Sequence, residues 1–261
     1  MKRLILGTNL KMYKGVNATL DYLRKLKHMT LDIDQKDLCL FVIPSYLALF
    51  PARQENADKL ILLGAQNMHW EDSGQFTGEI SPLMLKEIGI DIVEIGHSER
   101  RQLFNETDAN VNKKALAALK HGMKPLICVG ETIEDKTLGI TYEKLRLQVK
   151  TALNGMITEQ ARNVWLAYEP VWAIGVHGTP AEPTYVSMSH KMIRDVLVEL
   201  YPDACADIPI LYGGSVNMDN ARELIVQKNV DGLFIGRAAW TADSFNALIR
   251  DVFPYWRTKP I

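Results

Sequence analysis

The chain has 261 residues, of which 47% are hydrophobic and 23% are charged, and its 30 basic and 31 acidic side chains give a net charge of −1. This composition excludes a disordered chain, and the balanced charge provides no overall basic field for nucleic acid or an anionic membrane. The three cysteines are widely spaced and form no disulfide or zinc pattern, and the first residues contain too few apolar positions for a secretory signal. We therefore expect a cytoplasmic protein with no nucleic-acid or membrane partner.

Short aliphatic segments bounded by turn residues recur along the chain and predict eight strands. Runs such as Leu38–Ile43 are apolar throughout, which is typical of parallel strands that are buried on both faces. The predicted strands, in chain order, are Leu4–Asn9, Leu38–Ile43, Leu60–Gln66, Ile90–Ile95, Pro125–Val129, Val164–Tyr168, Ile210–Tyr212 and Gly232–Ile235. Apolar residues at helical spacing predict helices at Thr19–Lys27, Ala109–Lys120, Glu143–Leu153, Tyr185–Leu200 and Met218–Gln227. We expect the tail Pro254–Ile261 to be frayed or to lie on the surface.

Eight strands that alternate with helices are compatible with a closed (β/α)₈ barrel or with an open, doubly wound sheet. Nearly every predicted strand ends in polar or glycine-rich residues, such as Asn9, His97 and Glu169. In a barrel these ends meet in one ring, whereas in an open sheet they spread along an edge. No linker-like segment divides the chain. We therefore predict an α/β fold, a single-domain TIM barrel over residues 1–261.

Three of the polar strand ends are candidate catalytic groups. Glu169 follows an apolar strand, where partial burial favours a general base; a salt bridge or a helix cap is the alternative. His97 opens a helix, and the positive helix end disfavours a charged imidazole, so a neutral ring could donate to a carbonyl oxygen; a histidine packed against backbone is the alternative. Lys11 could stabilise an anion in the barrel mouth, or it could be a solvated loop lysine.

Two glycine-containing loops predict a phosphate site. Gly213–Ser215 follows the seventh strand and Gly236 follows the eighth, where barrels commonly bind phosphate; a tight turn explains one of these loops but not both. Small residues around Gly175 suit a hinged lid, although an ordinary exposed loop is the alternative. We expect Trp70, Trp165, Trp172 and Trp240 to serve packing, and His69, His121 and His177 to lie on the surface or in loops.

Together these groups suit proton abstraction next to the carbonyl of a small sugar phosphate. The carboxylate would remove a proton and return it to the adjacent carbon, while histidine and lysine stabilise the charge on the enediolate oxygens. The lid would exclude water from this intermediate. Since the chemistry needs only proton transfer, we expect no metal and no organic cofactor.

Six segments resemble the triosephosphate isomerase family, and they occur in family order between residues 7 and 240. The segments are Gly7–Met12, Phe76–Ser81, Gly96–Arg101, Cys128–Glu131, Ala167–Gly175 and Tyr212–Val216. The resemblance implies a cofactor-free interconversion of glyceraldehyde 3-phosphate and dihydroxyacetone phosphate, as in glycolysis and gluconeogenesis.

The resemblance also implies roles for particular residues. Glu169 corresponds to the base and His97 to the electrophile, while Asn9 and Lys11 contact the substrate and stabilise charge. Ser98 and Glu99 correspond to supporting residues, and the phosphate cradle corresponds to Gly175, Ser215, Gly236 and the backbone of Arg237. The family is homodimeric, and the loop containing Thr77 enters beside the partner's active site, so Thr77 would steady Asn9 and His97 across the interface.

Several positions depart from the family pattern and bear on the substrate. They are Leu10 after the first strand, Val176-His177-Gly178 at the second lid hinge, and Gly236-Arg237 in place of a glycine pair. Three segments, Gln66–Trp70, Gly178–Ala181 and Gly232–Arg237, instead resemble the branch of four-carbon erythrulose phosphate isomerases. We take the triose phosphate reaction as the primary hypothesis and the L-erythrulose 1-phosphate reaction as the alternative. A non-catalytic sugar-phosphate-binding protein is a remote alternative.

Overall fold

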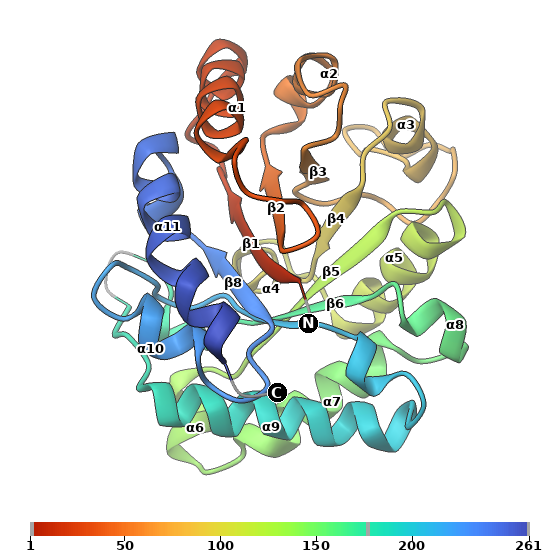
Figure 1. Cartoon of the computed structure of the whole chain (residues 1–261). Helices are drawn as coiled ribbons and strands as arrows, with labels where there is room; N and C mark the ends of the chain where they lie inside the picture. Colours follow the sequence, from red (N-terminus) through yellow and green to blue (C-terminus); the bar gives the residue numbers. More distant parts are fainter. Residues whose placement is uncertain (1–2, 176–177, 260–261) are drawn as a thin grey trace.

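The computed structural model describes residues 3–175 and 178–259, and its strands form a closed parallel barrel in the order β1-β2-β3-β4-β5-β6-β7-β8 (Figure 1). The strands are β1 (Leu4–Asn9), β2 (Leu38–Ile43), β3 (Ile61–Ala65), β4 (Ile92–Ile95), β5 (Lys124–Val129), β6 (Trp165–Tyr168), β7 (Ile210–Tyr212) and β8 (Gly232–Ile235). The barrel closes where Ile5 to Thr8 of β1 pair in parallel with Gly232 to Ile235 of β8. The predicted barrel is confirmed.

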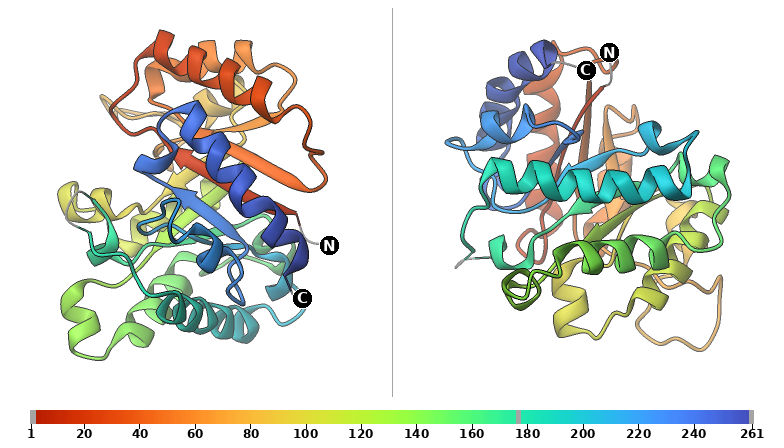
Figure 2. Two further views of the ribbon diagram at one scale, coloured as in Figure 1. Left: turned by 60° about the vertical axis from the view of Figure 1, so that its left-hand side comes forward. Right: turned by 90° about the horizontal axis from the view of Figure 1, so that it is seen from below.

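Helices surround the barrel on its outer side (Figures 1 and 2). They are α1 (Val16–Thr30), α2 (Tyr46–Glu55), α3 (Pro82–Glu87), α4 (Ser98–Leu103), α5 (Asp108–Lys120), α6 (Ile133–Thr137), α7 (Thr141–Ala152), α8 (Thr158–Ala161), α9 (Pro183–Leu200), α10 (Ala221–Ile225) and α11 (Ala242–Thr258), with short 3₁₀ turns at Val171–Ala173, Cys205–Asp207 and Arg237–Ala239. Around the ring, α1 packs against α2, α5 against α7, α7 against α9, α10 against α11, and α11 against α1. In the described part of the chain, no helix combines the length and the apolar sequence that a membrane crossing requires.

The strands are buried on both faces because one face lines the barrel interior and the other meets the helices. Ile5, Phe41 and Trp165 belong to the interior cluster, whereas Leu4 and Leu6 pack towards the helices. The Phe41 ring lies 5.7 Å from that of Trp165 and occupies the space beside β1. A Cβ atom at position 7 would lie 2.1 Å from the Phe41 ring, so only glycine fits there.

The end of the chain lies largely on the surface, as expected, but it is not frayed. Pro254, Tyr255, Arg257 and Thr258 are exposed, whereas helix α11 continues to Thr258 and Trp256 is buried against the core. Phe245, Ile249, Val252 and Trp256 recur at helical spacing, and their burial maintains the helix through Pro254. Lys259 lies beyond the helix, and residues 260–261 lie outside the described residues.

One expectation about a side chain is refined, and one about a helix is corrected. His69 lies in the loop that follows β3, as predicted, but it is buried there because its ring stacks between Trp70 and Phe76 at centroid distances of 4.2 Å. Helix α10 spans only Ala221–Ile225 instead of the predicted Met218–Gln227, because the side chain of Asn217 accepts hydrogen bonds from the backbone of residues 219 and 220 and holds this segment in a turn. His177 lies outside the described residues.

Candidate active site

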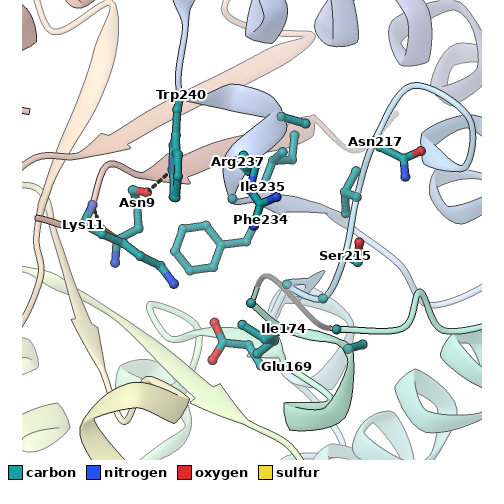
Figure 3. Close-up of a pocket in the computed structure, with 18 of the residues that line it drawn as sticks. Asn9, Lys11, Glu169, Ile174, Ser215, Asn217, Phe234, Ile235, Arg237 and Trp240 are labelled. Carbon is teal, nitrogen blue, oxygen red and sulfur yellow. Dashed lines mark hydrogen bonds between the residues drawn. The ribbon is translucent and has the colours of Figure 1, made fainter. Parts of the chain in front are cut away.

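The polar strand ends surround one cavity of about 380 Å³ at the carboxyl end of the barrel (Figure 3). Its wall includes the residues that the sequence predicted to catalyse or to bind substrate: Asn9, Lys11, His97, Glu169, Gly175, Ser215, Gly236 and Arg237. Ser98 and Glu99 lie behind this wall and contact it through hydrogen bonds. The structure therefore brings together groups that are up to 228 positions apart in sequence, from Asn9 to Arg237.

Asn9 and Lys11 are held by a network at the end of β1. The Asn9 Oδ1 atom accepts the backbone N–H of Lys11 at 2.6 Å and the Gln66 side chain at 3.2 Å. Lys11 has a φ of 49°, a left-handed conformation that costs a side-chain-bearing residue about 1–2 kcal/mol. The Lys11 ammonium lies 2.6 Å from Glu99 Oε1 and faces the cavity, where it can meet an anionic ligand.

His97 is oriented by the start of helix α4. Its Nδ1 accepts the backbone N–H of Glu99 at 3.1 Å, so the proton of a neutral ring resides on Nε2. Nε2 lies 3.6 Å from Glu169 Oε1 and 4.0 Å from Glu94 Oε1. The ring is buried and presents one N–H at the cavity floor, which suits donation to a developing oxyanion.

Glu169 directly follows β6 and is held by backbone contacts on both sides. Its N–H donates to Val129 at 2.7 Å, and its Oε2 accepts the backbone N–H of Ser98 at 3.3 Å. A Cβ at position 130 would lie 1.9 Å from the Glu169 carbonyl oxygen, and one at position 213 would lie 3.0 Å from its Cγ. Two glycines thus allow this carboxylate to sit where it does, buried beside His97.

The glycines of the predicted phosphate cradle serve different purposes. Gly214 is required because a Cβ there would lie 2.3 Å from the Tyr212 hydroxyl, so this glycine makes room for a core tyrosine. Gly236 faces open space, which leaves room for a ligand close to the backbone. Gly175 has a φ of 88°, a left-handed conformation that favours glycine. Of the predicted lid hinge, Gly175 and Gly178 are described by the structure. Val176 and His177 lie outside the described residues.

Arg237 and Lys11 are the cationic side chains that line the cavity. Arg237 is exposed and makes no hydrogen bond or ion pair with the described part of the chain. Its guanidinium is therefore available to a phosphate or to another polar group of a ligand. Thr77, by contrast, is exposed in the loop between β3 and α3 and does not line the cavity of its own chain.

Sequence reasoning missed Glu131 as the centre of a buried cluster beside the lid. Its carboxylate is fully buried and accepts hydrogen bonds from the Tyr168 hydroxyl at 3.0 Å, the Trp172 indole at 2.9 Å and the Tyr185 hydroxyl at 2.9 Å. Lys136 lies 3.6 Å from the centre of the Trp172 ring. Trp172 lies in the segment that leads to Gly175, so Glu131 holds the residues just before the predicted lid. Trp172 therefore does not serve packing alone, because its indole also donates a hydrogen bond to Glu131.

Trp240 and Glu94 were also missed as contributors to the site. The Trp240 indole donates to the Asn9 backbone carbonyl at 3.0 Å and lines the cavity. Glu94 of β4 is fully buried and accepts the Asn9 amide at 2.6 Å. Burial raises the pKa of the Glu94 carboxyl well above its ordinary value, and the charge of nearby Glu169 adds to this effect. The position of Glu94 between apolar residues of a predicted strand could have indicated a buried carboxylate.

A family model described as triosephosphate isomerase matches residues 4–252. The chain belongs to the triosephosphate isomerase family. It is therefore an isomerase, as the resemblance of its sequence motifs implied. The structural comparison agrees: the crystal structure of triosephosphate isomerase from Bartonella henselae aligns with a TM-score of 0.86 and 36% identity, covering 97% of this chain and 99% of that one.

Sequence relatives within the triosephosphate isomerase family have two names. A protein of Rhizobium etli named L-erythrulose-1-phosphate isomerase is 48% identical over 92% of this chain and 88% of its own length. A triosephosphate isomerase of Carboxydothermus hydrogenoformans is 42% identical over 96% of this chain and 99% of its own length. The comparison thus supports the isomerase class, but the names of these relatives do not distinguish a three-carbon from a four-carbon substrate.

Proposed function

We propose that this isomerase exchanges a carbonyl and a hydroxyl group between neighbouring carbons of a small sugar phosphate, with Glu169 as the base. The observation that carries the proposal is the pairing of the buried Glu169 carboxylate with the Nε2 of His97, 3.6 Å away, at the floor of one cavity. The short distance between the carboxylate and the ring N–H supports a base that acts beside a hydrogen-bond donor, which is what enediolate chemistry requires.

In the proposed reaction, Glu169 removes a proton from the carbon that bears the hydroxyl group, and the electron pair moves towards the carbonyl oxygen. His97 Nε2–H and the Lys11 ammonium stabilise the enediolate oxygens, and a proton passes between these two oxygens. Glu169 then returns its proton to the former carbonyl carbon. Asn9 helps to hold the reacting end, Ser98 and Glu99 position Glu169, His97 and Lys11, and no cofactor takes part.

The phosphate would bind on the opposite wall of the cavity. Ser215, Gly236 and Gly175 line this side, and Gly236 leaves open space for a ligand. The exposed guanidinium of Arg237 lies at the same wall (Figure 3) and adds positive charge. A dianionic phosphate would therefore be fixed at one end of the cavity, while the reacting carbons lie between His97 and Glu169.

The four-carbon ketose phosphate is the substrate that we favour, because the match to the Rhizobium etli protein, at 48% identity, exceeds that to the Carboxydothermus hydrogenoformans protein, at 42%. Arg237 supports this choice, since a free cation at the cavity wall can contact a substrate longer than a triose. The triose phosphate remains the second candidate, because the catalytic groups act on the part that both substrates share.

The test is turnover of the purified chain on L-erythrulose 1-phosphate and on glyceraldehyde 3-phosphate at matched concentrations. We expect a kcat/KM at least about tenfold higher for the four-carbon ketose, a difference of about 1.4 kcal/mol in transition-state binding. A triose preference of the same size would reverse the substrate assignment. Absence of turnover on both, with phosphate-ligand binding retained, would replace the isomerase proposal with a binding protein.

The role of Glu169 is tested with Glu169→Gln, which keeps the size of the side chain and removes the base. We expect turnover to fall by about 10²–10⁴-fold, because general bases contribute about this much, while binding of inorganic phosphate changes little. Glu182→Gln, at an exposed position that does not line the cavity, is the matched control. Equal losses in both variants would refute the assignment.

We further propose that two copies of the chain associate through the loop that contains Thr77. Residues 73–79 are all exposed, and they include Phe76, which is 43% exposed. An aromatic side chain at the tip of an exposed loop is suited to insertion into a partner. Light scattering should give twice the chain mass, and Phe76→Asp should shift it to the chain mass. A fully active wild-type monomer would exclude this arrangement.

A further inference from the structure

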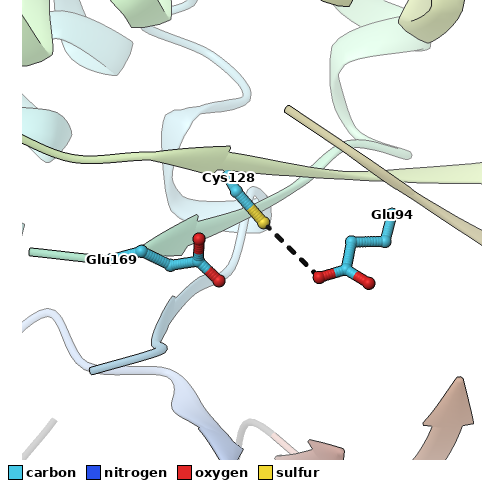
Figure 4. A group of neighbouring side chains, drawn as sticks. All are labelled: Glu94, Cys128 and Glu169. Carbon is cyan, nitrogen blue, oxygen red and sulfur yellow. Dashed lines mark hydrogen bonds between the residues drawn. The ribbon is translucent and has the colours of Figure 1, made fainter. Parts of the chain in front are cut away.

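A carboxyl group that the proposed reaction does not use lies inside the barrel beside the catalytic residues. Glu94 of β4 projects into the interior next to Cys128 of β5 and the Glu169 carboxylate (Figure 4). It is fully buried within an otherwise apolar strand. In the described part of the chain its side chain meets the Asn9 amide, the Cys128 thiol and the His97 ring, and it forms no ion pair with a lysine or an arginine. Such an acid is costly to bury, because neither water nor a fixed cation compensates it.

The short contact of this carboxyl group is a hydrogen bond with Asn9. The Glu94 Oε2 atom accepts Asn9 Nδ2 at 2.6 Å. The other two contacts are weaker, since Oε1 lies 4.0 Å from the Cys128 sulfur and 4.0 Å from His97 Nε2, which is too far for a hydrogen bond to the ring. A carboxyl group has an acceptor oxygen whether it is neutral or ionised, so the bond to Asn9 does not depend on the charge of Glu94.

This bond determines how the Asn9 amide is turned. On the opposite side, Asn9 Oδ1 accepts the backbone N–H of Lys11 at 2.6 Å and the Gln66 side chain at 3.2 Å. An amide has two N–H donors and two acceptor positions on its oxygen. Both acceptor positions are used and one N–H is given to Glu94, so the second N–H remains for a ligand in the cavity that Asn9 lines. Glu94 supplies the acceptor that fixes the nitrogen side of this amide.

The same amide holds the backbone of Lys11. Lys11 has a φ of 49°, in the left-handed region, which a residue with a side chain adopts only where its surroundings hold it there. Its N–H donates to Asn9 Oδ1, and its side chain lines the cavity. A series of contacts therefore runs from Glu94 through Asn9 to Lys11. Rotation of the Asn9 amide would release the Lys11 N–H and allow its backbone to relax, which would displace the ammonium.

We propose that Glu94 is a positioning residue for the isomerase reaction, which orients the Asn9 amide and, through it, the backbone that presents Lys11 to the substrate. This role rests on the proposed function, in which Asn9 and Lys11 act at the reacting end of the sugar phosphate. An apolar side chain would be less costly than an acid in the barrel interior. The bond to Asn9, rather than the stability of the fold, therefore accounts for a carboxyl group at this position.

Two substitutions separate a positioning role from a structural one. Glu94→Leu removes the acceptor and keeps a similar volume, and we expect kcat/KM to fall by about 10–100-fold, mostly through kcat, because small displacements of groups that act on the transition state cost this much. Glu94→Gln keeps an acceptor oxygen and should restore most of the turnover. Urea unfolding of Glu94→Leu should have a midpoint no lower than that of the wild type. A folded Glu94→Leu with the kcat/KM of the wild type would overturn the proposal.

A double-mutant cycle shows whether Glu94 acts through Asn9. Asn9→Ala alone should lower kcat/KM, and Glu94→Leu should add less than about twofold in that background, because the contact that it removes is already absent. An equal loss in both backgrounds would overturn the proposal, since Glu94 would then act on His97 or Glu169 directly. Cys128→Ala is the matched control, because it removes the weaker contact of Glu94 and should keep turnover near that of the wild type. Circular dichroism of each variant confirms that it is folded.

The orientation of Asn9 is measured without turnover by NMR of the protein with ¹⁵N-labelled asparagine side chains. The Asn9 amide pair is assigned by its absence from Asn9→Ala. We expect one of its protons to lie downfield in the wild type and in Glu94→Gln, because of the short bond to residue 94, and to shift upfield in Glu94→Leu. An unchanged Asn9 signal in Glu94→Leu would overturn the proposal. A wild-type protein that shows the downfield proton but no turnover would disprove the proposed function and leave the orientation of Asn9 by Glu94 standing.

Discussion

Replacing Glu131 with glutamine should destabilise the fold measurably, because this carboxylate satisfies three donors at once. The Tyr168 hydroxyl, the Trp172 indole and the Tyr185 hydroxyl all donate to it, and no part of it is exposed to water. All three donors point at Oε1, so an amide can keep an acceptor oxygen there, but this oxygen is neutral and makes weaker hydrogen bonds than a carboxylate. The NH₂ group replaces Oε2, which is the second acceptor of the Tyr168 hydroxyl.

The size of the effect follows from the number of hydrogen bonds. A hydrogen bond to a charged group contributes about 1.5–3 kcal/mol, and a neutral one contributes about 0.5–1.5 kcal/mol. Part of the difference is offset because a neutral amide is less costly to bury than a carboxylate. We therefore expect Glu131→Gln to lower the free energy of unfolding by about 2–4 kcal/mol.

Urea unfolding followed by circular dichroism at pH 7.5 measures this free energy. Tyr185→Phe is the matched control, because it removes one of the three donors and leaves the carboxylate with the other two; it should cost about 1–2 kcal/mol. If Glu131→Gln unfolds within about 0.5 kcal/mol of wild type, or if Tyr185→Phe is the more costly change, the cluster does not have the role inferred from its geometry.

Three further changes test other parts of the structure. Phe41→Ala should cost about 3–5 kcal/mol in urea unfolding, because it empties the centre of the barrel, and a loss below 1 kcal/mol would contradict the packing described. Gly130→Ala should reduce turnover by about a hundredfold, because its Cβ would displace the Glu169 backbone; Gly15→Ala, in open space, should not, and equal rates would contradict this. His190 is buried, and desolvation lowers its pKa from 6.5 to about 4. Between these two pH values the imidazole is protonated in the unfolded chain and neutral in the folded chain. The contribution of neutral His190 to the free energy of unfolding is therefore complete above pH 6.5 and is lost as the pH falls towards 4, with a loss of about 2 kcal/mol at pH 5. Urea unfolding at pH 8 and pH 5 measures this loss, and His190→Gln should remove most of it. A loss of the same size in His190→Gln would refute the assignment.

The strands were predictable from sequence because their apolar runs are short and sharply bounded. The predicted bounds of β1, β2, β7 and β8 agree with the structure, and the other four strands differ at their ends by one or two residues. The start of α4 at His97 was predicted, but the short helices α3 and α6 were not, since a helix of five or six residues shows too few turns for periodicity to appear. Their ends depend instead on local capping, such as the Thr132–Asp135 capping box of α6.

The predicted cavity residues were found together because each lies at the carboxyl end of a strand or in the loop that follows it, and in a parallel barrel these ends and loops meet on one side. Glu94 and Cys128 lie within strands, where both faces are buried and the sequence does not reveal which face a residue occupies. Glu131 was recognised only as part of the segment Cys128–Glu131 that resembles the family, because the residues that donate to it lie 37 to 54 positions away in the sequence. Such contacts depend on how β5, β6 and α9 pack against one another, and the pattern of apolar and polar residues within one segment does not predict this packing.

The bond between the Trp240 indole and the Asn9 carbonyl has a consequence for the synthesis of this enzyme. It joins two residues that are 231 positions apart, beside the pairing of β1 with β8. During translation, Asn9 and Lys11 leave the ribosome long before the cavity wall formed by residues 236–240 has been synthesised. A nascent or truncated chain that ends after β7 would have its base and electrophile but no wall from Gly236 to Trp240. Such a fragment exposes an open strand edge to chaperones and to other nascent chains until the last segment arrives.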